Sequence, residues 1–124
     1  MTYNNLVNEL SKIAVELNKE SDELCENIRH SNEQLNKLNI GIEVWIIIKD
    51  STLKLGYGKG ENHNWGLLIE SKDKKYYFND APRQCRIDVI ESIPELLKAI
   101  MHESRILLIK VKKAKDFIKS LPEF

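Results

Sequence analysis

The most constraining feature of this sequence is a repeat of apolar residues across its first forty positions. Counting from Tyr3 in alternating steps of four and three residues reaches eleven positions, nine of them apolar or aromatic. A 3.5-residue repeat sustained over five heptads is typical of a helix packed lengthwise on another. Such a helix would be roughly 50 Å long, more than the diameter of a compact domain of this size. The positions are Tyr3, Val7, Leu10, Ala14, Leu17, Ser21, Leu24, Ile28, Ser31, Leu35 and Leu38.

The same repeat returns near the other end of the chain, which predicts a second long helix from Ile93 to about Leu121. Its repeat is also interrupted by a serine, Ser104. We call the apolar stripe formed by each repeat its seam. We expect the two long helices to pair along one another and to cover an apolar face of a sheet. We also expect them to extend beyond the sheet into a homo-oligomer, because a seam that overhangs the sheet otherwise exposes apolar surface. A monomeric two-layer domain with shorter, bent helices is the alternative. The repeat positions are Leu97, Ile100, Ser104, Leu107, Val111, Ala114, Ile118 and Leu121.

Charge is balanced overall but unevenly distributed between the two ends. Residues 1–41 hold seven acids against four bases, and residues 93–124 hold four acids against seven bases. An excess of acids on one long helix and of bases on the other favours antiparallel or intersubunit pairing between them. Screening by salt makes this electrostatic contribution modest. Nucleic acid is the less favoured partner for the basic end, because the chain is neutral overall and contains an acidic helix as well.

Between these helices, residues 42–79 have the composition of a four-stranded antiparallel meander. The segments 42–49, 53–57, 65–70 and 75–78 are rich in β-branched and aromatic residues, and short turns at 50–52 and 71–74 separate them. In the first segment Ile42, Val44, Ile46 and Ile48 share the face that we expect to be buried. The predicted class is therefore α+β: helix 1–40, sheet 42–79 and helical part 81–121, in a single domain spanning 1–124.

Local signals mark the expected helix ends. Gly41 stands where a left-handed C-cap is usual after the first helix. Asp80 followed by Pro82 reads as an N-cap with proline in the first turn of a short helix, 81–91. Ser92 with Glu95 reads as a capping box that begins the last helix, so that the short helix is kinked into the long one.

Composition excludes several classes of protein. With 124 residues, 42% hydrophobic and 31% charged, the chain reads as an ordinary soluble domain, and no apolar run reaches membrane-spanning length. The first ten residues lack the pattern of a secretory signal, so we expect a cytoplasmic protein without membrane association. Cys25 and Cys85 stand alone, without metal-ligand spacing, so no metal, cofactor or disulfide is predicted.

The segment 56–66 is the most functional-looking, because it holds four of the five glycines. Closely spaced glycines let backbone N–H groups approach an anion, to which Lys59 and His63 would add positive charge. No helix follows, so neither the dinucleotide fingerprint nor the P-loop applies. A flexible hairpin with glycine bulges is the alternative.

Two arginines add a second candidate anion site. Arg83 and Arg86 lie three residues apart at an expected helix start, where free backbone N–H groups also favour phosphate or carboxylate. Internal pairing with Asp80, Asp88 or Glu43 is the alternative.

Three aromatic residues complete the candidate site. If Trp45, Tyr57 and Trp65 share the sheet face opposite the helices, they form an aromatic floor able to stack a base or to bury a partner's side chain. If Trp65 points inward, it belongs to the core.

Three stretches resemble a set of uncharacterised small bacterial and prophage proteins with a helix–sheet–helix layout. They are LNIGIEVW, GYGK…NWGLLIE and DAPRQCR…IPELLKA, and the resemblance is best over residues 38–101. It implies no activity, and at most a recurrent constellation of Trp65, Gly66, Asp80, Arg83 and Arg86.

The functional expectation is a non-enzymatic homo-oligomeric protein that binds an anionic small ligand, such as a nucleotide or a nucleotide-derived defence signal that a phage-type protein would sequester. The alternative is a protein-interaction or inhibitor module that docks a host protein through its helices or aromatic sheet face. A small hydrolase using His63 ranks third, because no paired acids or nucleophile–base spacing support catalysis. The predicted ligand-binding residues are Trp45, Tyr57, Lys59, His63, Trp65, Arg83 and Arg86.

Overall fold

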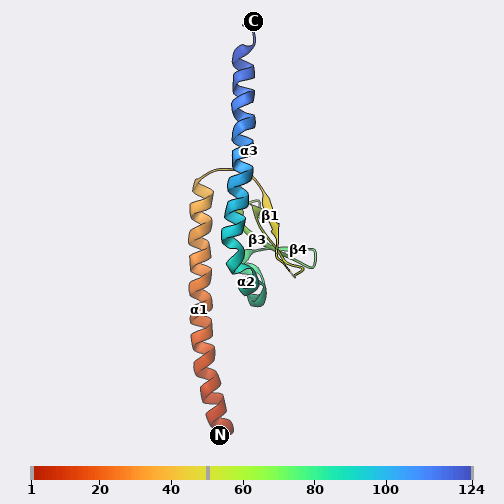
Figure 1. Ribbon diagram of the computed structural model, residues 1–124. Helices are drawn as coiled ribbons and strands as arrows, with labels where there is room; N and C mark the ends of the chain where they lie inside the picture. Colours follow the sequence, from red (N-terminus) through yellow and green to blue (C-terminus); the bar gives the residue numbers. More distant parts are fainter. Residues whose placement is uncertain (1, 50, 124) are drawn as a thin grey trace.

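The computed structural model describes residues 2–49 and 51–123 and confirms the predicted α+β layout. A long helix leads into a four-stranded meander, and a short helix is joined to a long C-terminal helix (Figure 1). Asp50, in the predicted first turn, lies outside the described residues. The elements are α1 Tyr3–Lys37, β1 Val44–Ile47, β2 Lys54–Lys59, β3 Trp65–Ser71, β4 Lys74–Tyr77, the 3₁₀ turn η1 Phe78–Asp80, α2 Arg83–Val89, the 3₁₀ turn η2 Ile90–Ser92 and α3 Ile93–Ser120.

The sheet is antiparallel throughout, in the order β1-β2-β3-β4. Leu55 pairs with Ile46 on one side and with Ile69 on the other, so all three point to the same face. Leu55 and Ile69 are completely buried. Val44 and Ile48 are buried in the same core, as the alternation in residues 42–49 predicts.

Both long helices contribute to the core on this face of the sheet. Ile28 of α1 and Leu96 and Ile100 of α3 belong to the same buried cluster as the sheet residues. The main contacts of α1 are with β3 and η1, whereas those of α3 are with β1 and β2. The sheet therefore receives apolar residues from the C-terminal half of α1 and from the N-terminal part of α3.

The predicted pairing of the two long helices along their length is wrong. In Figure 1 they run in the same direction and extend past the sheet at opposite ends, α1 beyond the end that carries α2 and α3 beyond the other. Antiparallel pairing within the chain is therefore excluded. The physical reason is that the sheet, and not the other helix, covers the C-terminal half of the α1 seam and the N-terminal part of α3.

The helix ends depart from the expected caps in three places. After α1, Asn39 with φ 51° already takes the left-handed conformation, two residues before Gly41 with φ 68°. Asp80 ends η1 instead of capping α2, whose N-cap is Pro82. Ser92 has helical dihedral angles and makes no side-chain cap hydrogen bond, because η2 runs directly into α3. The proline near the start of α3 is as predicted.

No helix among residues 2–49 and 51–123 combines the length and the apolar composition that crossing a membrane requires.

Candidate functional site

The seven predicted ligand-binding residues do not form one site. They are distributed over four places: a pocket at the β2–β3 loop, a hollow beside β4, the open face of the sheet, and the contact between α1 and α2.

Tyr57, His63 and Trp65 do lie together, in a pocket of about 280 Å³. The rings of Tyr57 and Trp65 are 5.6 Å apart between centroids and tilted by 36°. The Tyr57 hydroxyl donates a hydrogen bond to Asn36 Oδ1 of α1, and burial raises the pKa of this phenol above its ordinary value. The pocket offers aromatic surface, amide groups and the imidazole of His63. It is completed by Asn36, Asn39, Ile40, Gly41 and Asn64.

Lys59 lines a different hollow, of about 560 Å³, beside β4. The positive charge of Lys59, Lys74 and Lys75 is balanced there by an equal number of acids: Glu61, Asp73 and Asp80. This composition gives no net attraction for an anion.

The aromatic floor is not formed, because Trp45 and Trp65 lie on opposite faces of the sheet. Lys59 pairs with Trp65, so Trp65 follows Leu67 and Ile69 onto the helix-covered face. Trp45 instead lies against Gly56 on the open face, with Lys75 Nζ 5.4 Å from its ring centroid. The inward alternative for Trp65 is therefore the one observed.

Arg83 and Arg86 point to α1 and not to a shared anion site. Arg83 Nη2 donates to Asn18 Oδ1 over 3.2 Å, and Arg86 Nη1 donates to Cys25 Sγ over 2.7 Å. Neither arginine forms an ion pair among the described residues, so the predicted alternative of internal pairing with acids is also wrong. Together they border a small hollow of about 170 Å³, whose other walls include Leu17, Leu24 and Ile87.

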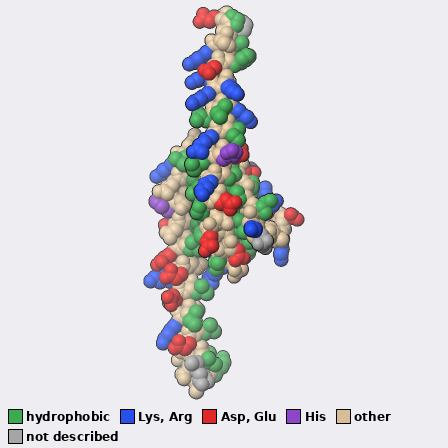
Figure 2. Space-filling model, in the orientation of Figure 1, with side chains coloured by type: hydrophobic (Ala, Val, Ile, Leu, Met, Phe, Trp, Pro, Cys, Tyr) green, Lys and Arg blue, Asp and Glu red, His purple; other side chains and the backbone are tan. Residues whose placement is uncertain are grey.

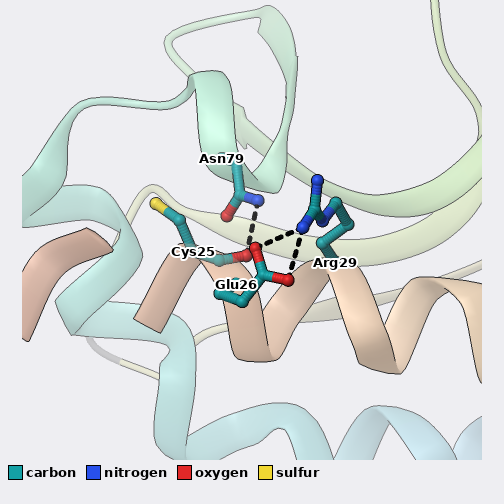
Figure 3. Close-up of polar contacts among 4 residues, drawn as sticks. All are labelled: Cys25, Glu26, Arg29 and Asn79. Atoms are coloured by element: carbon teal, nitrogen blue, oxygen red, sulfur yellow. Dashed lines mark hydrogen bonds and ion pairs between the residues drawn. The ribbon is translucent and has the colours of Figure 1, made fainter. Parts of the chain in front are cut away.

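Three structural asparagines, Asn32, Asn36 and Asn79, are not among the residues predicted from the sequence. Asn32 and Asn36, one helical turn apart on α1, bind the backbone of β3 at Leu67 and Trp65. Asn79 of η1 donates from Nδ2 to the Cys25 carbonyl of α1 over 2.9 Å, beside the exposed Arg29–Glu26 ion pair (Figure 3). The i, i+4 spacing of Asn32 and Asn36 was the signal that could have found the first two.

Metal-binding side chains do not cluster within the described residues. No group of three or more His, Cys, Asp or Glu side chains could hold a metal ion there, and Cys25 and Cys85 are both free thiols.

The most extensive unusual surface belongs to the two helices where they leave the sheet. We call residues 3–20 of α1 the α1 overhang and residues 105–120 of α3 the α3 overhang. Every residue of both is exposed. Contiguous exposed apolar surface on a soluble protein marks an interaction site. The large apolar residues exposed on or at the end of the overhangs are Tyr3, Leu6, Val7, Leu10, Ile13, Val15, Leu17, Ile106, Leu107, Leu108, Ile109, Val111, Phe117, Ile118 and Leu121.

Comparison of this chain with protein-family models, curated proteins and solved structures finds no match.

Proposed function

We propose that this protein is a non-enzymatic, self-assembling binding protein whose α1 and α3 overhangs are its assembly surfaces. The observation that carries this proposal is the exposure of both seams: Leu10 is 65% exposed and Ile118 is 65% exposed. Complete burial of a Leu or Ile side chain contributes about 1.5–3 kcal/mol. Covering a few such residues on each overhang therefore favours association strongly.

The contacts of the α1 overhang with α2 lie at its C-terminal end, at Leu17 and Asn18, although every residue of the overhang is exposed. The apolar face before Leu17 is uncovered, which supports the same proposal. Most helix stability in proteins comes from packing an amphipathic face. A seam that keeps its period through both overhangs supplies such a face for another helix.

Sedimentation velocity tests the proposal. The wild-type protein is expected to sediment as an oligomer at micromolar concentration, whereas Leu10→Asp and Ile118→Asp, which place a charge within the seams, shift it toward the monomer. Matched controls are Val15→Asp and Ile109→Asp, because these residues, 70% and 55% exposed, lie on the same overhangs but off the seams. A wild-type protein that remains monomeric, or off-seam variants as disruptive as the seam variants, would reject the proposal.

Binding of an anionic small ligand stays a prediction. The cations expected to hold this ligand are separated, because Lys59, His63 and the pair Arg83 and Arg86 line three different pockets. Native mass spectrometry of the purified protein tests it directly, because a bound nucleotide adds its mass to the oligomer. Docking of a host protein on the overhangs would instead appear there as a heteromeric complex.

A further inference from the structure

We infer that the α1 overhang of one copy packs in parallel against the α3 overhang of a second copy, so that copies join head to tail. This inference rests on the proposed function and specifies which surfaces meet. It follows from the lengths, the charges and the heptad positions of the two overhangs.

The two overhangs match in length and period. At 1.5 Å per residue they extend about 27 Å and about 24 Å. Each seam leaves the sheet at a half-buried serine, Ser21 in α1 and Ser104 in α3. Beyond that serine each seam has five apolar positions, so the two can align layer by layer. They are Tyr3, Val7, Leu10, Ala14 and Leu17 in α1, and Leu107, Val111, Ala114, Ile118 and Leu121 in α3.

The charges favour contact between unlike overhangs. The α3 overhang has six bases and one acid, so packing it against a second α3 overhang would oppose like charges. The α1 overhang, by contrast, holds three acids and two bases, and Asp22 and Glu23, just beyond it, add two more acids. Figure 2 shows basic side chains along the upper helix and mostly acidic ones along the lower helix. The surface of this chain that complements the α3 overhang is therefore the α1 overhang.

The positions of the charges also specify the direction of packing. Acids recur every seven residues along one flank of the α1 seam, and bases recur every seven residues along the opposite flank of the α3 seam. With Leu10 and Leu107 at position d, the acidic row lies at position c, on the g side of the α1 seam, and the basic row lies at position b, on the e side of the α3 seam. The g side of one helix faces the e side of the other in parallel coiled coils. An antiparallel arrangement would place the basic row against the flank that carries Asn4, Ser11 and Asn18. The two rows are Glu9, Glu16 and Glu23, and Arg105, Lys112 and Lys119.

Each copy carries one overhang of each kind at opposite ends (Figure 1). A contact between unlike surfaces is heterologous, and such contacts build rings or filaments instead of a closed two-fold dimer. We therefore expect the size of the assembly to increase with protein concentration until a ring closes or a filament extends.

Zero-length carbodiimide cross-linking of the wild-type protein tests the contact. The protein is prepared as an assembled mixture of ¹⁴N- and ¹⁵N-labelled copies, and the linked peptides are identified by mass spectrometry. We expect mixed-isotope links between acids of residues 9–23 and lysines of residues 110–119, because the two overhangs of one chain point away from each other. If the mixed-isotope links join only α1 to α1, or only α3 to α3, the inference is overturned.

Charge reversal gives a second, independent test. The triple variant Glu9→Lys, Glu16→Lys, Glu23→Lys is expected to assemble about tenfold more weakly or worse, as is the triple variant Arg105→Glu, Lys112→Glu, Lys119→Glu. An equimolar mixture of the two should recover assembly, because each reversed overhang then meets its complement. The inference is contradicted if each triple variant alone assembles as strongly as the wild type, or if mixing the two variants does not restore assembly. A monomeric wild-type protein would reject the proposed function itself, whereas an oligomer that fails these two tests rejects only the pairing.

Discussion

Asn32 Oδ1 on α1 accepts a hydrogen bond from the backbone N–H of Leu67 on β3, over 2.9 Å. β4 pairs with β3 only from Leu68 onward, so this N–H lies at a sheet edge that no strand covers. One turn along the helix, Asn36 Nδ2 donates to the Trp65 carbonyl over 3.0 Å. The two asparagines thus continue the hydrogen bonding of β3 after β4 has ended.

Replacing Asn32 by alanine should therefore destabilise the fold. Leu67 is completely buried, so its N–H would lose its partner in a place where water has little access. The cost of an unsatisfied buried donor is about 1–3 kcal/mol. Urea denaturation measures it, with Gln34→Ala, an exposed position two residues away on the same helix, as the control. Equal stability of the two variants would show that the hydrogen bond contributes nothing.

Gly56 allows the indole of Trp45 to lie flat on the open face of the sheet. A Cβ at position 56 would stand 2.4 Å from the Trp45 ring, whereas one at Gly66 would meet its nearest neighbour at 3.6 Å. We expect Gly56→Ala to cost about 1–3 kcal/mol through overpacking, and Gly66→Ala to change stability by about 0.5 kcal/mol or less.

A double-mutant cycle distinguishes overpacking against Trp45 from a general cost of alanine in this strand. In the Trp45→Leu background the clash is removed, so Gly56→Ala should lose most of its effect on the free energy of unfolding. If Gly56→Ala is equally costly in both backgrounds, the strain lies elsewhere.

The alternation in residues 42–49 is enough to predict which side chains of β1 face the core, because one face of that strand is covered and the other is not. The face of Trp65 could not be predicted from such a pattern. It depends on whether β2 continues through Gly58 to Lys59, and a shift of one residue moves Trp65 to the other face. The separation of Arg83 from the loop likewise depends on where α2 docks, which no local spacing encodes.

The seams illustrate a related limit. Leu10, Leu24 and Leu35 all lie on the α1 seam, yet Leu24 and Leu35 pack against the core whereas Leu10 is exposed. The repeat specifies that a helix has an apolar face. It does not specify whether a sheet, a helix of the same chain or a second copy covers that face.

Because of Tyr57, the stability of the fold should depend on pH in the alkaline range. Burial raises the pKa of its phenol above the ordinary value of 10.0, and the hydroxyl donates to Asn36, so the folded state favours the protonated form. Above pH 10 the unfolded chain releases this proton more readily than the folded one. The contribution of Tyr57 to stability is therefore complete below pH 10 and declines as the pH rises toward its folded pKa. Denaturation series from pH 8 to 11 should show this decline, with a smaller slope in Tyr57→Phe and no such change in the exposed Tyr3→Phe.

The two arginines of α2 should differ in their contribution to stability, although sequence spacing placed them in one anion site. Arg86 is half-buried between α2 and α1 with its guanidinium on Cys25 Sγ, whereas Arg83 is exposed and touches Asn18 at the surface. Arg86→Ala removes both the aliphatic stem and the hydrogen bond and should cost about 1–2 kcal/mol, whereas Arg83→Ala should stay within about 0.5 kcal/mol of wild type. Arg86→Met restores the stem without the charge, so recovery of most of the loss in thermal or urea denaturation would assign it to packing. Loss of nucleotide-induced thermal stabilisation in Arg83→Ala, without loss of folding, would instead contradict the structural role and restore the anion site.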